Sequence, residues 1–259
     1  MYQYIKYEID NNVAVITLNN HEKVNALSFD MIDELHKALS EVETNSDVRA
    51  LLIWGGQEKF FSAGGDLADL SKSTVSDAYV ISRKSHKLYE RIEALNIPTV
   101  AAVGGFAFGG GFEISLSCDF RVINEKAKFG LTEATLGLIP GGGGTVRLPK
   151  LLGATKAKEL MFLGKILRAE DAMQLGIASQ VVPVGELYNA ALEFAKQLGS
   201  QAPLSIGAIK KLMRDGESLP DSTAYELEAA AFSRLFDTKD TQEGMAAFLE
   251  KRPPVYIGE

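Results

Sequence analysis

The sequence has little of what several classes of protein need. It contains one cysteine, Cys118, and three histidines among 259 residues. It can therefore form no internal disulfide and offers no cysteine-rich metal site, which favours a reducing compartment. Residues 1–12 lack the apolar core of a signal peptide and the arginines of a transit peptide. There is also no apolar run of about 18 residues, so we expect no membrane span and a cytoplasmic protein.

Several catalytic motifs are also missing. The chain has no GxSxG, HExxH or GxGxxG motif and no GxxxxGK followed by serine or threonine. Serine-hydrolase, zinc-protease, Rossmann and P-loop functions therefore lack motif support. The net charge of −7, from 27 basic and 34 acidic residues, argues against broad nucleic-acid binding but permits a local basic patch. We expect the chemistry to rest on carboxylates and backbone amides.

Strand and helix patterns alternate over residues 1–150, which predicts an α/β core. The strands are short apolar runs, and the helices show apolar residues spaced three and four apart. We predict strands at Val13–Leu18, Arg49–Trp54, Thr99–Val103 and Phe120–Ile123, and helices over 28–42 and 79–95.

The pattern changes after Pro149, where helix-forming residues dominate. Little strand pattern remains beyond Gln180–Val182. No linker separates the two parts, so we expect the later helices to pack on the core, on themselves or on a neighbouring subunit. The predicted helical segments are 154–163, 168–176, 186–200, 203–214 and 222–252.

Two glycine-bearing segments follow predicted strands and could supply backbone amides. Residues 60–67 (FFSAGGDL) combine small residues with glycines, which let a ligand approach free N–H groups. Residues 104–113 (GGFAFGGGFE) lead into a helix that we expect to begin near Gly110, with Glu113 in its first turn. Each segment alone is also compatible with an ordinary turn or a surface carboxylate.

A third segment, 129–146, is almost uncharged apart from Glu133. A carboxylate buried there without a partner would cost stability, so Glu133 is either exposed or functional. Together the three segments offer two possible donor sites and two carboxylates. Activation of a thioester needs such a set, because N–H groups stabilise the developing enolate oxygen while carboxylates move protons.

At this point the sequence resembles the crotonase family, the enoyl-CoA hydratase/isomerase superfamily, over essentially its whole length. Each matching motif is short, but their order and spacing are specific. The motifs are KVNAL at 23–27, SAGGD at 62–66, GGGFE at 109–113, GLIPG at 137–141 and FLEKR at 248–252.

The resemblance implies an oxyanion hole formed by the backbone N–H groups of Ala63 and Gly110. It also implies that Glu113 and Glu133 hold one water, with Glu133 supplying a proton to the α carbon of a trans-2-enoyl-CoA and Glu113 orienting or deprotonating the water. The sequence does not fix how the proton roles divide between the two. No metal or redox cofactor is implied, since CoA is part of the substrate. The implied acyl-CoA contacts are Lys23, Ala26, Ala63, Gly64, Gly65, Asp66, Leu67 and Gly110.

The family's fold is a spiral of ββα repeats followed by a helical trimerisation region, which we place at residues 1–195 and 196–259. Such chains form trimers or hexamers, and C-terminal helices of a neighbouring subunit often complete the CoA site. Phe232, Phe248 and Lys251 occupy the matching positions here. We expect a homotrimer or homohexamer that takes part in β-oxidation or the breakdown of branched acids.

The resemblance leaves other activities open. An isomerase shifting a 3-enoyl to a 2-enoyl thioester typically uses one carboxylate, whereas both positions are occupied here. A hydratase of branched, methylglutaconyl-type thioesters and a non-catalytic acyl-CoA-binding or RNA-binding member are further alternatives. Two residue pairs depart from the hydratase pattern: Thr132-Glu133 replaces Pro-Glu, and Gly104-Gly105 replaces Asn-Gly. Finally, Phe106, Phe108 and Phe112 are expected to be core residues more than walls of an acyl pocket.

Overall fold

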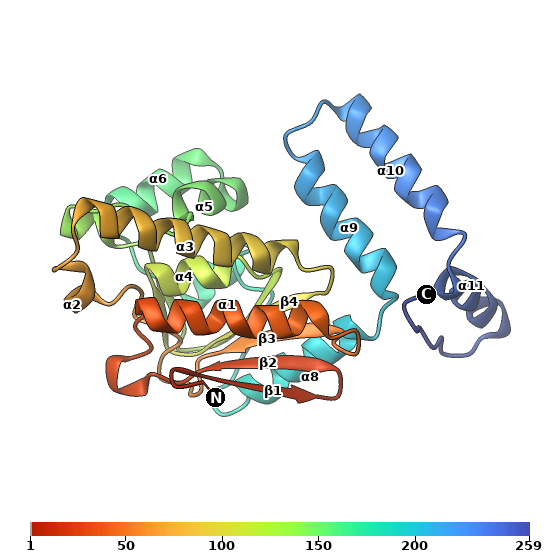
Figure 1. Ribbon diagram of the computed structural model, residues 1–259, viewed down its shortest axis with the longest axis horizontal. Coiled ribbons are helices and arrows are strands. Elements are labelled where there is room, and N and C mark those ends of the chain that lie inside the picture. The colour runs from red at the N-terminus through yellow and green to blue at the C-terminus, as the bar shows by residue number, and fades with distance from the viewer. Residues whose placement is uncertain (1) are drawn as a thin grey trace.

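A computed structural model describes residues 2–259 as an α/β fold built on a six-stranded sheet (Figure 1). The strand order is β1-β2-β3-β4-β6-β9. β1 and β2 form an antiparallel hairpin, and every other neighbouring pair in this sheet is parallel. The bounds are β1 Ile5–Asp10, β2 Val13–Leu18, β3 Ala50–Trp54, β4 Thr99–Val103, β6 Phe120–Asn124 and β9 Gln180–Val182.

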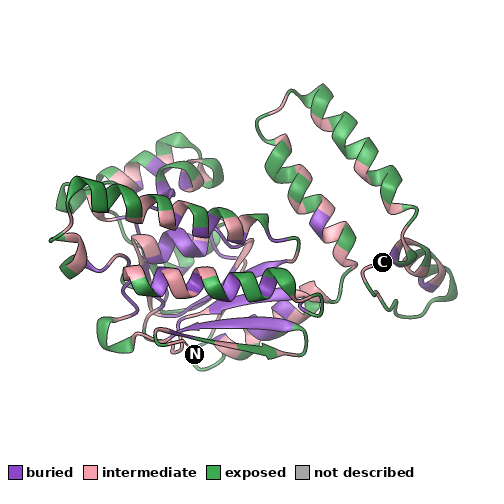
Figure 2. Cartoon of the chain, viewed as in Figure 1, coloured by how far each residue is buried: buried purple, intermediate pink, exposed green. Residues whose placement is uncertain are grey.

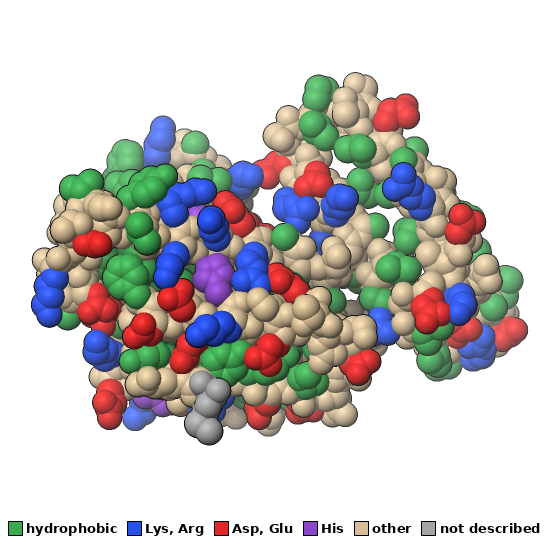
Figure 3. Space-filling view, viewed as in Figure 1, with side chains coloured by type: hydrophobic (Ala, Val, Ile, Leu, Met, Phe, Trp, Pro, Cys, Tyr) green, Lys and Arg blue, Asp and Glu red, His purple; other side chains and the backbone are tan. Residues whose placement is uncertain are grey.

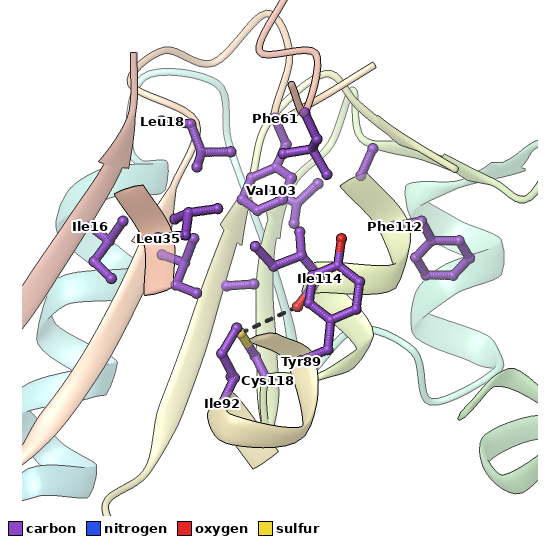
Figure 4. Packing of buried hydrophobic residues seen from close by; sticks show 14 of the residues in the cluster. Ile16, Leu18, Leu35, Phe61, Tyr89, Ile92, Val103, Phe112, Ile114 and Cys118 are labelled. Atoms are coloured by element: carbon purple, nitrogen blue, oxygen red, sulfur yellow. Dashed lines mark hydrogen bonds between the residues drawn. The ribbon is translucent and has the colours of Figure 1, made fainter. Parts of the chain in front are cut away.

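Helices cover both faces of this sheet, which explains why its inner strands are apolar without alternation. Val13 and Val15 of β2 belong to the core cluster on the side of α8, while Ile16 and Leu18 belong to the larger cluster that includes α1 and α3. Figure 4 shows part of this larger cluster, and Figure 2 shows how burial concentrates in the sheet. The covering helices are α1 Phe29–Thr44, α3 Val75–Ala94 and α8 Leu187–Gly199.

A second, three-stranded sheet stands beside the first and positions the glycine-rich segments. Its order is β5-β7-β8, with bounds Phe106–Phe108, Lys128–Gly130 and Leu167–Arg168. An isolated bridge pairs Ser62 with Ala107 of β5, and another pairs Leu27 with Gly65. These bridges bring residues 62–65 alongside the turn that leads from β5 into α4 (Gly110–Leu116).

The remaining elements are mostly helical. Residues 67–174 contribute four short helices, and two 3₁₀ turns flank the site segments. They are α2 Leu67–Leu70, α5 Gly144–Leu152, α6 Ala154–Phe162 and α7 Ala169–Gln174, with 3₁₀ turns at His21–Lys23 and Glu133–Leu136. The chain ends in α9 Pro203–Gly216, α10 Asp221–Leu235 and α11 Lys239–Glu250.

The predicted α/β class is confirmed, and the predicted strands match the structure closely. The helix expected over 79–95 begins earlier, at Val75, because Thr74 and Asp77 form a capping box there. The segment 222–252 is two helices, since the second helix begins after Thr238 as its own N-cap. Pro149 lies inside α5, so the change of pattern there does not mark a helix boundary.

The C-terminal helices extend away from the sheet (Figure 1). α9 and α10 pack against each other, and α10 has no buried residue. The expected trimerisation region stays a prediction, as does the division at residues 195 and 196, which falls inside α8. Over residues 2–259, no helix combines the length and apolarity needed to cross a bilayer.

Candidate active site

A cavity of about 330 Å³ opens between α3, residues 63–70, the start of α4 and the loops at 132–142. Its wall is mainly apolar, with contributions from Leu27, Ile32, Ile81, Leu136 and Ile139. The ionisable carboxyl groups that line it are Asp66, Asp69, Glu113 and Glu133. The two glutamates predicted as catalytic therefore come together in one cavity, although they lie 20 residues apart in the sequence.

Glu113 stands in the first turn of α4, and its side chain is held by backbone amides. Gly142 N donates to Oε1 at 2.8 Å and to Oε2 at 3.0 Å, and Gly144 N donates to Oε1 at 2.7 Å. Gly144 is the first residue of α5, so the positive end of that helix also faces the carboxylate. Burial raises the pKa of Glu113, while these amides and Arg147 act in the opposite direction.

Glu133 is positioned differently, at the first residue of a short 3₁₀ turn. Its Oε2 atom is buried and has no hydrogen-bond partner within residues 2–259. Burial raises the pKa of Glu133 to about 7, and the charge of Glu113 contributes in the same direction. The pair thus combines a carboxylate stabilised by hydrogen bonds with a carboxyl group that readily holds a proton at neutral pH.

The amide donors differ from the prediction at one position. Ala63 N already donates to Val24 O at 3.0 Å, so the prediction that this N–H is free to bind an oxyanion is wrong. Two residues later, Gly65 N has no hydrogen-bond partner in the described chain, and the same is true of Gly110 N. These two amides are neighbours, since a Cβ atom built on Gly110 would lie 3.7 Å from Gly65 N.

The fold itself explains this shift from Ala63 to Gly65. Residues 63–66 pair with residues 24–27, but Gly64 has a φ of +95°, so the regular alternation of an extended strand is broken between Ala63 and Gly65. Leu27 N donates to Gly64 O, and Asp66 N donates to Leu27 O. Gly65 N is therefore directed away from the paired strand, on the side of the cavity that Gly65 lines.

Of the other predicted contact residues, Asp66 and Leu67 line the cavity, whereas Lys23, Ala26 and Gly64 do not. Lys23 Nζ forms a 2.7 Å ion pair with Asp66, and this pair lowers the pKa of the Asp66 carboxyl. Asp66 also accepts the Ala68 N–H at 3.0 Å and so begins α2. Leu67 is 56% exposed at the cavity, whereas Ala26 is buried next to this segment.

The three predicted residues of the C-terminal region also lie outside this cavity. Phe232 on α10, Phe248 on α11 and Lys251 at the end of α11 are exposed and do not line it. Phe232 packs edge-to-face on Phe236, the C-cap residue of the same helix. Their predicted role depends on a neighbouring subunit, so it stays a prediction.

Of the three phenylalanines of the second glycine segment, one lies in the core and one lines the cavity, whereas Phe106 is partly buried and does neither. Phe112 is fully buried and packs against Phe129, as expected for a core residue. Phe108 instead lines the cavity and stacks on Phe106, with ring centres 5.0 Å apart. The core prediction is therefore confirmed for Phe112 and wrong for Phe108.

Sequence reasoning gave no role to several residues that shape the site. Tyr89 of α3 is buried beside the cavity, and its hydroxyl donates to Gly110 O at 3.3 Å. Arg147 donates to Gly142 O at 2.9 Å. The run of four glycines at 141–144 was visible in the sequence, but which carboxylate it surrounds depends on the packing of α4 against α5.

Comparisons with known proteins agree with this geometry. The model of the enoyl-CoA hydratase/isomerase family matches residues 8–259. A short-chain-enoyl-CoA hydratase of Clostridium acetobutylicum is 38% identical over 95% of this chain and 94% of its own. A crotonyl-CoA hydratase of Syntrophomonas wolfei is 36% identical over 100% of this chain and 99% of its own.

Solved structures show the same fold. The crystal structure of an enoyl-CoA hydratase from Bacillus anthracis superposes with a TM-score of 0.95. It is 37% identical in sequence and covers 99% of this chain and 100% of that one. The chain belongs to the enoyl-CoA hydratase/isomerase family, and its fold is the crotonase fold.

The close contact between Gly142 and Glu113 generates a stability prediction. A Cβ atom at residue 142 would lie 2.5 Å from both Glu113 Oε2 and Tyr89 Cε2. We expect Gly142→Ala to lower the free energy of unfolding by about 1–3 kcal/mol, because this buried site has no room for a methyl group. Urea unfolding at matched protein concentration measures the change.

The neighbouring glycine provides the control. A Cβ atom at Gly141 would meet only Ser82 Oγ, at 4.0 Å. Gly141→Ala should therefore change the free energy of unfolding by no more than about 0.5 kcal/mol. Equal stabilities for the two variants would contradict the packing described here.

Proposed function

We propose that this protein is an enoyl-CoA hydratase, which adds water to a trans-2-enoyl-CoA and yields a 3-hydroxyacyl-CoA. The observation that carries the proposal is the meeting of two unlike carboxyl groups, Glu113 and Glu133, in a cavity that also holds two unbonded amides. Relatives named as hydratases support the same activity.

In this mechanism the thioester oxygen binds between Gly65 N and Gly110 N. As water attacks the β carbon, the electrons of the double bond move toward that oxygen, and the two N–H groups stabilise the enolate that forms. Gly110 is the first residue of α4, so the positive end of the helix adds to the stabilisation. The glycines leave the backbone open to the substrate on this side.

The two carboxyl groups then divide the proton transfers. Glu113, held as a carboxylate by Gly142 and Gly144, orients the water and takes one of its protons as the oxygen bonds to the β carbon. Glu133 begins protonated and gives its proton to the α carbon. One proton thus resides on the pair before and after each turnover, and its return from Glu113 to Glu133 resets the site.

The rest of the substrate follows the cavity rim. Lys23, Ala26 and residues 63–67 contact the CoA part, and Lys251, Phe232 and Phe248 of a neighbouring subunit complete this contact in a trimer or hexamer. The enzyme acts in the cytoplasm on intermediates of acid breakdown such as β-oxidation. CoA enters as part of the substrate, and the mechanism requires no metal or redox cofactor.

The charges of the cavity favour a neutral acyl group. Within the described chain no lysine, arginine or histidine lines it, whereas four carboxyl groups do, at Asp66, Asp69, Glu113 and Glu133. A terminal carboxylate on the acyl chain would find no basic partner among these lining residues and would be repelled by the ionised Glu113 in a partly desolvated space. We therefore favour unsubstituted or methyl-branched enoyl groups over methylglutaconyl groups.

The RNA-binding alternative finds no support on the face shown in Figure 3, where basic and acidic side chains are interspersed. Two basic residues of α3 are also paired with carboxylates of α1. Lys84 binds Asp33 at 2.8 Å, and Arg91 binds Glu43 at 2.7 Å. This face is therefore not a strip of one charge sign of the kind that binds phosphate backbones.

The central prediction concerns the two glutamates. Wild-type protein should hydrate crotonyl-CoA rapidly, seen as loss of the conjugated-enoyl absorbance. Glu113→Gln and Glu133→Gln should each lower kcat by about a hundredfold or more, because each removes a proton-transfer group. A folded wild type that binds CoA but leaves crotonyl-CoA unchanged would contradict the proposal.

Two further substrates separate the alternatives in the same assay. Formation of the conjugated product from a 3-enoyl-CoA, without hydration, would identify an isomerase. Comparison of 3-methylcrotonyl-CoA with 3-methylglutaconyl-CoA isolates the effect of the terminal carboxylate, since both carry the same branch. We expect the neutral thioester to have the higher kcat/KM.

A second prediction concerns pH. Because the active pair carries one proton and the pKa of Glu133 is about 7, loss of that proton should lower activity as the pH rises. We expect kcat/KM to fall about tenfold per pH unit above the pKa. The hydration and dehydration directions should share this inflection, because the overall reaction releases no proton. A flat profile to pH 9 would contradict the assigned roles.

A further inference from the structure

The glycine loop, residues 141–144, bonds Glu113 and is itself held by two side chains, Arg147 and Glu93, that do not line the cavity. Gly142 accepts a 2.9 Å hydrogen bond at its carbonyl oxygen from Arg147 Nη1. The other two guanidinium nitrogens of Arg147 donate to Glu93, Nε at 2.7 Å and Nη2 at 2.8 Å. Arg147 therefore joins the loop to α3 through a two-point ion pair.

This ion pair is partly shielded from solvent, which favours a single arrangement of the two side chains. The Arg147 side chain is 11% exposed and that of Glu93 is 35% exposed. The guanidinium also lies over the ring of Tyr89, 5.8 Å from its centre. The two hydrogen bonds to Glu93 and the contact with the Tyr89 ring thus fix the plane of the guanidinium group. Its third nitrogen, Nη1, is then directed at the carbonyl oxygen of Gly142.

Residue 142 transmits this restraint to the site. Its carbonyl is fixed by Arg147, and its N–H bonds both oxygens of Glu113. A shift of the loop would therefore change the orientation of the carboxylate that is to hold the attacking water. Ser82, also on α3, adds a second anchor by donating to Gly141 O at 2.7 Å.

We propose that the Glu93–Arg147 ion pair is a positioning device for Glu113, acting through the Gly142 backbone. The expected effect on the hydration rate rests on the hydratase function proposed above. Its structural part, that the pair orders the glycine loop, is independent of which reaction the site performs. Neither residue lines the cavity, so we expect both to act on turnover and not on binding.

The test compares wild type with Glu93→Gln, Arg147→Gln and the double variant, using crotonyl-CoA. We expect kcat to fall at least about tenfold in each single variant with KM nearly unchanged, since a misplacement of about 1 Å can cost about a hundredfold. Because Glu93 acts only through Arg147, Glu93→Gln should cause no further loss in the Arg147→Gln background. Independent, multiplicative losses would overturn the proposal.

Arg91→Gln is the matched control. Arg91 lies on the same helix and forms a similar two-point ion pair with Glu43, with distances of 2.9 and 2.7 Å, but it contacts α1 and not the glycine loop. We expect its kcat to stay within about twofold of wild type. A loss equal to that of Arg147→Gln would mean that any ion pair on α3 matters equally, and would overturn the proposal.

Hydrogen exchange of the peptide that spans Gly142 and Gly144 gives a readout without turnover. These amides should exchange faster in Glu93→Gln and Arg147→Gln than in wild type or Arg91→Gln, and Arg147→Lys should restore part of the protection. Unchanged exchange in a folded Glu93→Gln protein would overturn the proposal. If wild type exchanges as expected but does not hydrate crotonyl-CoA, the proposed function fails while the positioning role stands.

Discussion

The site depends on one interaction, the binding of the buried Glu113 carboxylate by the amides of Gly142 and Gly144. An ionised carboxylate that is 3% exposed would be costly without donors. The glycine loop supplies them from the start of α5 and leaves no room for a side chain at Gly142 or Gly144. The loop is bonded to Ser82 of α3, and Glu113 belongs to α4. This contact therefore also connects two helices that line the same cavity.

The unlike surroundings of the two glutamates follow from the same packing. Glu113 accepts hydrogen bonds from the N–H groups of Gly142 and Gly144, whereas Glu133 Oε2 is buried without a partner in the described chain. Similar side chains are thereby suited to different proton-transfer roles. The amides of Gly65 and Gly110 provide the hydrogen-bond donors of the site. Gly65 lies in the β-bridge with Leu27, and Gly110 is the first residue of α4.

Much of this could be predicted from sequence, and the failures have physical reasons. The apolar inner strands and the periodic helices were recognisable, but β1 was not, since its mixed sequence IKYEID depends on pairing with β2. Both glutamates were found because charge stands out in glycine-rich, uncharged segments. Ala63 was chosen instead of Gly65 because the direction of an N–H group follows from pairing with residues 24–27. The roles of Tyr89 and Arg147 depend on helix packing, which local patterns do not contain.

The most direct test of the central claim is the infrared carbonyl stretch of bound butanoyl-CoA, labelled with ¹³C at the thioester carbon. This saturated thioester cannot be hydrated, so it reports polarisation by the site alone. The account predicts a stretch at lower frequency in the complex than in water, because Gly65 N and Gly110 N both donate to the carbonyl oxygen. A frequency equal to or above that in water, for ligand shown to be bound, would contradict the oxyanion hole and the mechanism built on it.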